Sequence, residues 1–157
     1  MNMSGETVIG GESGEEPFEV LLVEDNPADV RLTREAFRAG PYPCRVRVAE
    51  DGESALRMLH RDAPFEHAPR PHLILLDLNL PRRDGREVLS DIKSDRDLRA
   101  IVVIVLTSSD AEEDVAASYA LLANCYIVKP VDYDGLVSLI REIESFWLGV
   151  ARLPRAA

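Results

Sequence analysis

Two short runs of purely apolar residues constrain the fold more than any other feature of the 157-residue sequence. One is LILL, within the segment HLILLD (residues 72–77), and the other is IVVIVL (residues 101–106). A strand without polar side chains has to be buried on both faces, as the central strands of a parallel sheet are when helices cover both sides. We therefore expect a parallel sheet between two layers of helices.

Strand-like and helix-like segments alternate five times along the chain. The expected strands are 18–23, 44–49, 72–77, 101–106 and 125–128. The expected helices are 26–40, 51–60, 85–94, a fourth that carries Val115, Tyr119 and Leu122, and 133–148. This alternation is typical of right-handed βαβ units. It predicts an α/β fold of the (βα)5 type, with a doubly wound, parallel five-stranded sheet.

Capping residues support two of the helix boundaries. Asn26 is expected to cap a helix that begins at Pro27 and is stopped by Gly40. Asp110 and Glu113 have the spacing of a capping box before the fourth helix.

The two cysteines lie in strand-like segments of different character. Cys44 begins CRVRVA (residues 44–49), whose alternation of apolar and basic residues predicts a half-exposed strand at an edge of the sheet. Cys125 begins the apolar run CYIV. Neither has metal-ligand spacing, so we expect free, buried thiols in a reducing cytosol.

The chain length fits one domain. Residues 1–17 are rich in Gly, Glu and Ser without a sustained period, which predicts a disordered tail. The periodic region, residues 18–148, is expected to be that domain, followed by a short C-terminal tail at 149–157. No output domain is expected after Leu148.

The formal net charge is −10, which argues against nucleic acid and anionic membrane surfaces as partners because both require a basic face. The sequence has no apolar run long enough to cross a bilayer and no signal segment at its start. We expect no nucleic-acid partner, no membrane partner and a cytoplasmic location.

Polar residues follow four of the expected strands. The first strand is followed by Glu24 and Asp25, the third ends at Asp77, the fourth is followed by Thr107, and the fifth is followed by Lys129. Each alone has an ordinary explanation, such as a helix cap, a turn or a surface lysine. In open α/β sheets, however, ligands bind beyond the carboxyl ends of the strands, so the joint placement predicts a site.

Three carboxylates at one sheet edge would repel one another unless a cation neutralised them. Ligands that are all oxygen suit a hard cation, and few protein ligands with several waters suit Mg²⁺. The sequence therefore predicts a Mg²⁺ site that includes Glu24, Asp25 and Asp77.

The order and spacing of four motifs, VLLVEDNP, LILLDLNLPRRDG, VVIVLTSS and YIVKP, resemble the receiver domain of response regulators in two-component signalling. The resemblance covers residues 18–148 and implies the flavodoxin-like receiver fold. The runs LPRRDGREVLSDIK, VLTSSDAEED, ANCYIVKPVD and FWL are similar to single-domain regulators associated with bacterial phytochromes.

The resemblance implies that Asp77 is phosphorylated by a histidine kinase, for example a bacterial phytochrome, or by a histidine phosphotransfer protein. Asp25 would bind Mg²⁺ directly and Glu24 through water. Asp77 would add a side-chain oxygen and Asn79 its backbone carbonyl. Lys129 would pair with a phosphoryl oxygen.

The resemblance also implies a conformational switch. The hydroxyl of Thr107 would move to the phosphoryl group, and Tyr126 would turn inward behind it; the alternative for Tyr126 is an ordinary half-buried core residue. The family usually has a cis peptide before the proline that matches Pro130. Leu122 stands where the family often has glycine at the end of the fourth helix.

Other readings stay open at this point. A degenerate receiver would act as a phosphorylation-independent binding module. A phosphatase with an aspartyl nucleophile would need a carboxylate at Asn79, and a nucleotide or flavin binder would need a glycine-rich phosphate loop that is missing. We expect no enzyme beyond one that catalyses its own phosphorylation and dephosphorylation.

The last helix has two apolar stripes. The stripe expected to face the sheet contains Leu136, Ile140, Ile143 and Trp147. The second contains Leu139, Phe146 and Val150, with Leu153 beyond. An exposed apolar stripe is unusual on a monomer, so we expect a symmetric homodimer through the last helix region, unless the tail at 149–157 covers the stripe.

Overall fold

The computed structural model describes residues 16–154. The tail predicted at residues 1–17 therefore lies outside the described residues, except for Glu16 and Pro17. Five strands form one parallel sheet in the order β2-β1-β3-β4-β5. The strands are β1 (Phe18–Val23), β2 (Cys44–Ala49), β3 (Leu73–Leu76), β4 (Val102–Thr107) and β5 (Cys125–Val128). The predicted (βα)5 class is confirmed.

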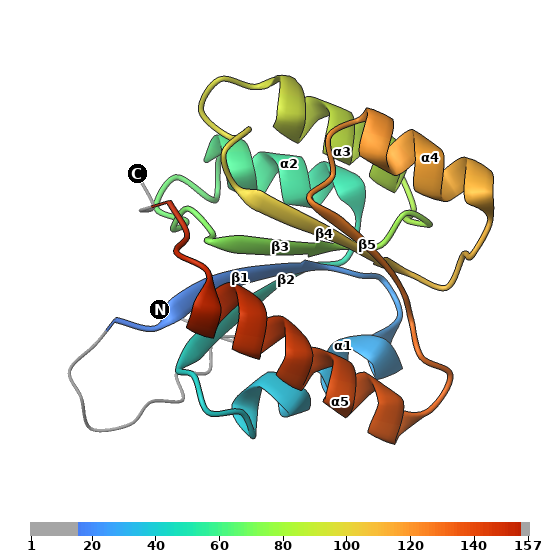
Figure 1. Ribbon diagram of the computed structural model, residues 1–157. Helices are drawn as coiled ribbons and strands as arrows, with labels where there is room; N and C mark the ends of the chain where they lie inside the picture. The colour runs from blue at the N-terminus through green and yellow to red at the C-terminus, as the bar shows by residue number, and fades with distance from the viewer. Residues whose placement is uncertain (1–15, 155–157) are drawn as a thin grey trace.

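Helices cover both faces of the sheet, with α1 and α5 on one side and α2, α3 and α4 on the other (Figure 1). The helices are α1 (Pro27–Arg38), α2 (Gly52–His60), α3 (Gly85–Ser94), α4 (Glu112–Ala120), α5 (Tyr133–Ile143) and the π-helix η1 (Glu144–Val150). Each layer encloses its own apolar core against the sheet. β3 is the central strand, and all four of its residues are fully buried, as the run LILL predicts.

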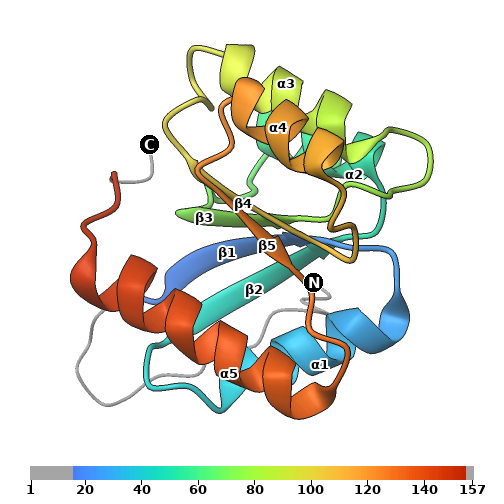
Figure 2. The ribbon, with the colours of Figure 1, turned by 45° about the vertical axis from the view of Figure 1, so that its right-hand side comes forward.

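The edge strands behave as the sequence indicates. In β2, Cys44 and Val46 are buried while Arg45 and Arg47 are half-buried, which confirms the predicted edge. β5 forms the opposite edge, between α4 and α5 (Figure 2). Both cysteines are free thiols as expected, but only Cys44 is buried, whereas Cys125 is half-buried. Burial raises the pKa of the Cys44 thiol to about 12, so it stays protonated.

The start of α1 follows the prediction. Oδ1 of Asn26 accepts hydrogen bonds from the backbone N–H groups of Ala28 (2.9 Å) and Asp29 (3.1 Å). Pro27 takes the first helical position, where its missing N–H costs nothing. This cap directs the chain straight from the end of β1 into the first turn of α1.

The start of α4 differs from the prediction. The capping box of Asp110 and Glu113 is wrong, because the helix begins one residue later and its N-cap, Ala111, has no capping side chain. Ser109 replaces it: its Oγ accepts from the Ala111 N–H (3.3 Å) and donates to Asp114 (2.5 Å).

The end of α4 is also shorter than expected. The helix ends at Ala120, so Leu122 is not part of it. Leu122 has a φ of 72° and is exposed, which explains why a glycine would suit this position.

The last helix changes its register after Ile143. α5 is α-helical to Ile143, but residues 144–150 form a π-helix, in which the Ala151 N–H bonds to the Phe146 carbonyl. A π-turn adds about one residue to each turn. The next buried apolar residue after Ile143 is therefore Leu148, five residues on, and not Trp147 as expected. Trp147 is only half-buried.

None of the helices in residues 16–154 combines the length and apolar character that a membrane span requires.

Candidate functional site

The carboxyl ends of β1, β3, β4 and β5 bring the predicted residues together. Asp77 follows β3 directly, and its backbone N–H donates to the carbonyl of Val23 at the end of β1 (3.0 Å). The loop after Asp77 turns back so closely that a Cβ on Gly85 would overlap the Asp77 and Leu78 backbone. Glycine is therefore required at Gly85 to let α3 begin directly beneath the strand end.

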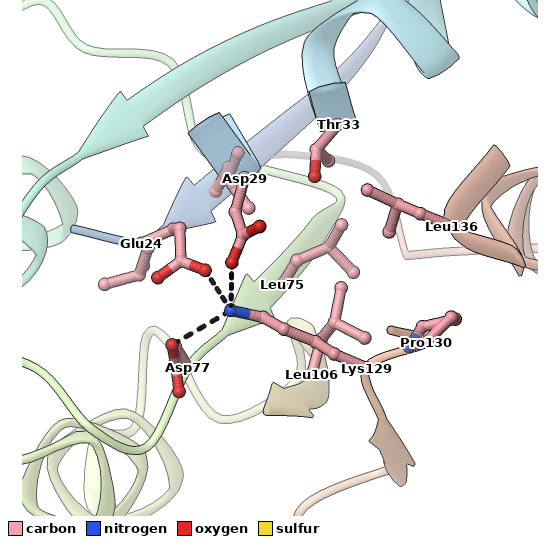
Figure 3. Close-up of a pocket in the computed structure, with 11 residues that line it drawn as sticks. Glu24, Asp29, Thr33, Leu75, Asp77, Leu106, Lys129, Pro130 and Leu136 are labelled. Carbon is pink, nitrogen blue, oxygen red and sulfur yellow. Dashed lines mark hydrogen bonds and ion pairs between the residues drawn. The ribbon is translucent and has the colours of Figure 1, made fainter. Parts of the chain in front are cut away.

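Lys129 lies at the centre of the site (Figure 3). Its backbone N–H donates to the Thr107 carbonyl (2.8 Å), which ties the chain after β5 to the end of β4. Its side chain is mostly buried, and Nζ forms ion pairs with Glu24, with Oδ2 of Asp77 (3.1 Å) and with Oδ2 of Asp29 (3.0 Å). One ammonium thus faces three carboxyl groups.

The Asp77 carboxyl group is held at both oxygens. Oδ1 accepts hydrogen bonds from the Thr107 hydroxyl (2.8 Å) and from the Asn79 backbone N–H (3.1 Å), while Oδ2 faces Lys129. Asp77 is only 7% exposed. The side chain is therefore fixed in orientation before any ligand arrives.

Electrostatics in the site reflect the excess of carboxyl groups. Burial raises the pKa of Glu24 to about 8, although Lys129 opposes the shift. Burial acts to raise the pKa of Asp77 too, but a hydrogen bond from Glu24 and the charge of Lys129 outweigh it and hold the pKa below its usual value. Burial acts to lower the pKa of Lys129, and its bond to Glu24 reverses this, so the ammonium keeps its charge.

The acidic residues fit a divalent cation. Oxygens of Glu24, Asp25 and Asp77 all lie within 4.8 Å of one another. Asp25 is exposed while Glu24 and Asp77 are buried, so such a cation would keep water on one side. Carboxylate oxygens with retained water are the donor set that Mg²⁺ prefers.

A cavity of about 20 Å³, room for about one water molecule, lies beside Lys129. Apart from the polar residues at the site, it is lined mainly by the apolar residues Leu22, Val23, Leu75, Leu106, Pro130 and Leu136. These residues exclude bulk water from the inner side of the lysine, which strengthens its ion pairs.

The peptide bond before Pro130 is trans, so the expected cis bond is wrong; the cis peptide among the described residues is Ala63–Pro64. Trans is the lower-energy form of an X–Pro bond. Lys129 reaches the carboxyl groups without the tighter turn.

Tyr126 connects β5 to the loop before α4. Its hydroxyl donates to the Ser109 carbonyl (2.9 Å), and its backbone N–H donates to the Tyr119 hydroxyl (3.1 Å). The ring is half-buried against the core of the α2–α4 layer. The geometry is compatible with an ordinary core tyrosine and with a switch.

Sequence reasoning missed two features. Asp29 reaches Lys129 from the first turn of α1, and its only signal in the sequence is a carboxylate five residues after Glu24. The second is an ion pair from Arg86 of α3 to Asp114 of α4, which joins these helices next to Ser109. No pattern in the sequence pairs residues so far apart.

Residues 20–141 match the response regulator receiver domain family. The chain belongs to this family. Response regulator Rcp1 of Synechocystis sp. is 46% identical over 140 residues, which cover 89% of this chain and 95% of Rcp1. The family assignment and the two-component class predicted from the motifs are confirmed.

Solved structures agree with this assignment. The phosphorylated cyanobacterial phytochrome response regulator RcpA has a TM-score of 0.87 at 46% identity, covering 89% of this chain and 100% of RcpA. The Mn²⁺-bound form of Rcp1 has a TM-score of 0.85 at 46% identity, covering 88% of this chain and 100% of that one. The bacteriophytochrome response regulator RtBRR has a TM-score of 0.70 at 40% identity, covering 90% and 85%. The predicted likeness to phytochrome-associated regulators is thus confirmed, and a relative binds a divalent metal.

Proposed function

We propose that this receiver domain accepts a phosphoryl group on Asp77 and changes conformation in response. The observation that carries the proposal is the position of the Asp77 carboxyl group. It is buried, and it lies next to both Lys129 and the carboxyl groups of Glu24 and Asp25. In the transfer, a carboxylate oxygen of Asp77 attacks phosphorus as the bond from phosphorus to the donor histidine nitrogen breaks. The products are an aspartyl phosphate and a free imidazole.

The residues around Asp77 supply position and charge, which is most of what phosphoryl transfer requires. Thr107 and the Asn79 N–H fix one oxygen of the nucleophile. Lys129 offers a positive charge on the other side, where phosphoryl oxygens can pair with it.

We assign a Mg²⁺ site to the acidic cluster, with Asp25, Asp77 and the Asn79 backbone carbonyl as direct ligands and Glu24 acting through water. When bound, the ion neutralises negative charge on the transferred group. Removing Asp25, the exposed member of the cluster, should abolish Mg²⁺ binding without disturbing the core. Calorimetric titration of Asp25→Ala tests this, and unchanged affinity would reject the ligand set.

For the response, we propose that the Thr107 hydroxyl moves from Asp77 to the phosphoryl group and that Tyr126 follows it inward. Both are near enough to be linked: Tyr126 bonds to the carbonyl of Ser109, two residues after Thr107. A shift of the loop that contains Ser109 would therefore alter the position of the tyrosine.

The proposed donor is a cytoplasmic sensor histidine kinase or a histidine phosphotransfer protein. Relatives described as phytochrome and bacteriophytochrome response regulators make a phytochrome kinase the first candidate to test.

We propose a homodimer through the last helix region. Phe146 is 52% exposed and Val150 is 73% exposed, while Leu153 packs against the core beside α5. The described part of the tail therefore does not cover the two exposed apolar residues. The π-helix contributes to this arrangement, because its wider turn places Leu148 inward and leaves Phe146 at the surface.

Incubation with acetyl phosphate and Mg²⁺, followed by intact mass measurement, tests the proposed function. One added phosphoryl group per chain is expected. No addition would instead favour a degenerate receiver that binds partners without phosphorylation.

A further inference from the structure

Lys129 contacts two of the three carboxyl groups that could hold a divalent cation. These belong to Glu24 and Asp77, and Nζ pairs with both. Two positive charges a few ångströms apart repel strongly in a partly buried site. We therefore expect Lys129 to move away from Glu24 and Asp77 when the cluster holds a metal.

Asp29 is the remaining carboxylate that Lys129 contacts. Its Oδ2 lies 3.0 Å from Nζ, yet it is not part of the acidic cluster. It comes from α1, on the side of Nζ away from Asp77 (Figure 3). Its contact with Lys129 therefore remains available when Glu24 and Asp77 are engaged elsewhere.

The position of Asp29 is fixed by its own helix. It lies in the first turn of α1, where the Asn26 side chain accepts its backbone N–H (3.1 Å). The helix dipole favours a negative charge at this end. Asp29 is also less buried than Glu24 or Asp77, so its charge is better solvated.

We propose that Asp29 is a positioning residue for Lys129. It holds the ammonium at the edge of the site when Glu24 and Asp77 are engaged with a cation. This clears the metal ligands and keeps the lysine within reach of a group attached to Asp77. The second consequence rests on the proposed phosphoacceptor function, whereas the first concerns metal binding alone.

The proposal predicts that Asp29 assists metal binding through Lys129. Without the Asp29 charge, Lys129 has only Glu24 and Asp77 as ion-pair partners and competes harder for them. Loss of a nearby negative charge would also weaken metal binding directly, but by the same factor whether or not Lys129 is present. A double-mutant cycle separates these effects.

The experiment measures Mg²⁺ affinity by calorimetry in the wild type, Asp29→Asn, Lys129→Met and the double variant. Asp29→Asn should weaken binding by about fivefold or more when Lys129 is present, and by about twofold or less in the Lys129→Met background. Glu35→Gln removes a charge from an exposed position on the same helix and should have the same small effect in both backgrounds. Asp29→Glu, which restores the charge, should bind Mg²⁺ nearly as well as the wild type.

If Asp29→Asn weakens Mg²⁺ binding by the same factor in the two backgrounds, the proposal is wrong. Weak Mg²⁺ binding by Asp29→Glu would also overturn it, provided that the thermal unfolding of this variant matches the wild type. Phosphorylation by acetyl phosphate is measured separately. A wild type that takes no phosphoryl group would reject the proposed function, while the Mg²⁺ cycle would still decide the role of Asp29.

Discussion

The hydroxyl of Thr107 donates a 2.8 Å hydrogen bond to Oδ1 of Asp77, and both residues are buried at the ends of neighbouring strands. The bond joins β4 to the carboxyl group at the end of β3. A phosphoryl group on Asp77 would compete for the same hydroxyl. Thr107 could therefore link phosphorylation of Asp77 to a movement of the loop before α4.

Thr107→Val should separate phosphorylation from the conformational response. Valine keeps the shape of the buried side chain but cannot donate, and hydrogen bonds to charged groups contribute about 1.5–3 kcal/mol. Asp77 should still accept phosphate. The ratio of switched to resting conformer, read from the Tyr126 resonances in NMR spectra, should fall by about tenfold or more. Thr107→Ser, which keeps the hydroxyl, is the control. Wild-type spectral changes in phosphorylated Thr107→Val would contradict the proposed switch.

Phe146→Glu should convert a dimer into a monomer. The ring is exposed and stacks edge-on against Trp147 at 5.0 Å, so a charge here would disrupt an apolar interface without entering the core. Analytical ultracentrifugation at micromolar concentration should show a dimeric wild type and a monomeric variant that still accepts phosphate. Val131→Glu adds the same charge at an exposed apolar residue near the other end of α5 and should stay dimeric. A monomeric wild type would end the dimer hypothesis.

His72 should make the fold less stable in mild acid. Its Nδ1 accepts the backbone N–H of Glu19 (3.0 Å), and burial lowers its pKa, although Glu16 opposes the shift. A histidine with a depressed pKa in the folded state stabilises the fold above its unfolded pKa of about 6.5, and this contribution is lost as pH falls through that value. Protonation of Nδ1 would also break the bond from Glu19.

Denaturant unfolding at several pH values between about 7.5 and 5 measures this effect. The free energy of unfolding should fall more steeply in the wild type than in His72→Asn, whose amide oxygen can still accept but does not titrate. His67→Asn, at an exposed position, should keep the wild-type slope. The same slope in the wild type and His72→Asn would show that the ring does not titrate as described.

The sheet, and the residues that follow the carboxyl ends of its strands, could be predicted from the sequence. The runs LILL and IVVIVL could only be buried strands, and the residues that follow a parallel strand lie at one edge by topology. Glu24, Asp77 and Lys129 therefore meet as predicted. Asp29 was missed because it belongs to a helix, and only the three-dimensional path of α1 brings it to a lysine one hundred residues later.

The last helix shows a different limit. A period of 3.6 residues correctly placed Leu136, Ile140 and Ile143 against the sheet, but then selected Trp147 in place of Leu148. The π-turn responsible includes Glu144, which is fully buried and paired with Arg141. Arg141 also donates to the Ala36 carbonyl of α1, and a tertiary contact of this kind cannot be read from the local period.

Reductive trapping can identify the residue that accepts the phosphoryl group, which we propose to be Asp77. After reaction with acetyl phosphate and Mg²⁺, borohydride reduces an aspartyl phosphate to homoserine, and peptide mass spectrometry locates the altered residue. We expect conversion at Asp77 in the wild type and none in Asp77→Asn, whose amide is not a competent nucleophile. Conversion at a different residue in the wild type, or an unchanged yield of modified peptide in Asp77→Asn, would contradict it.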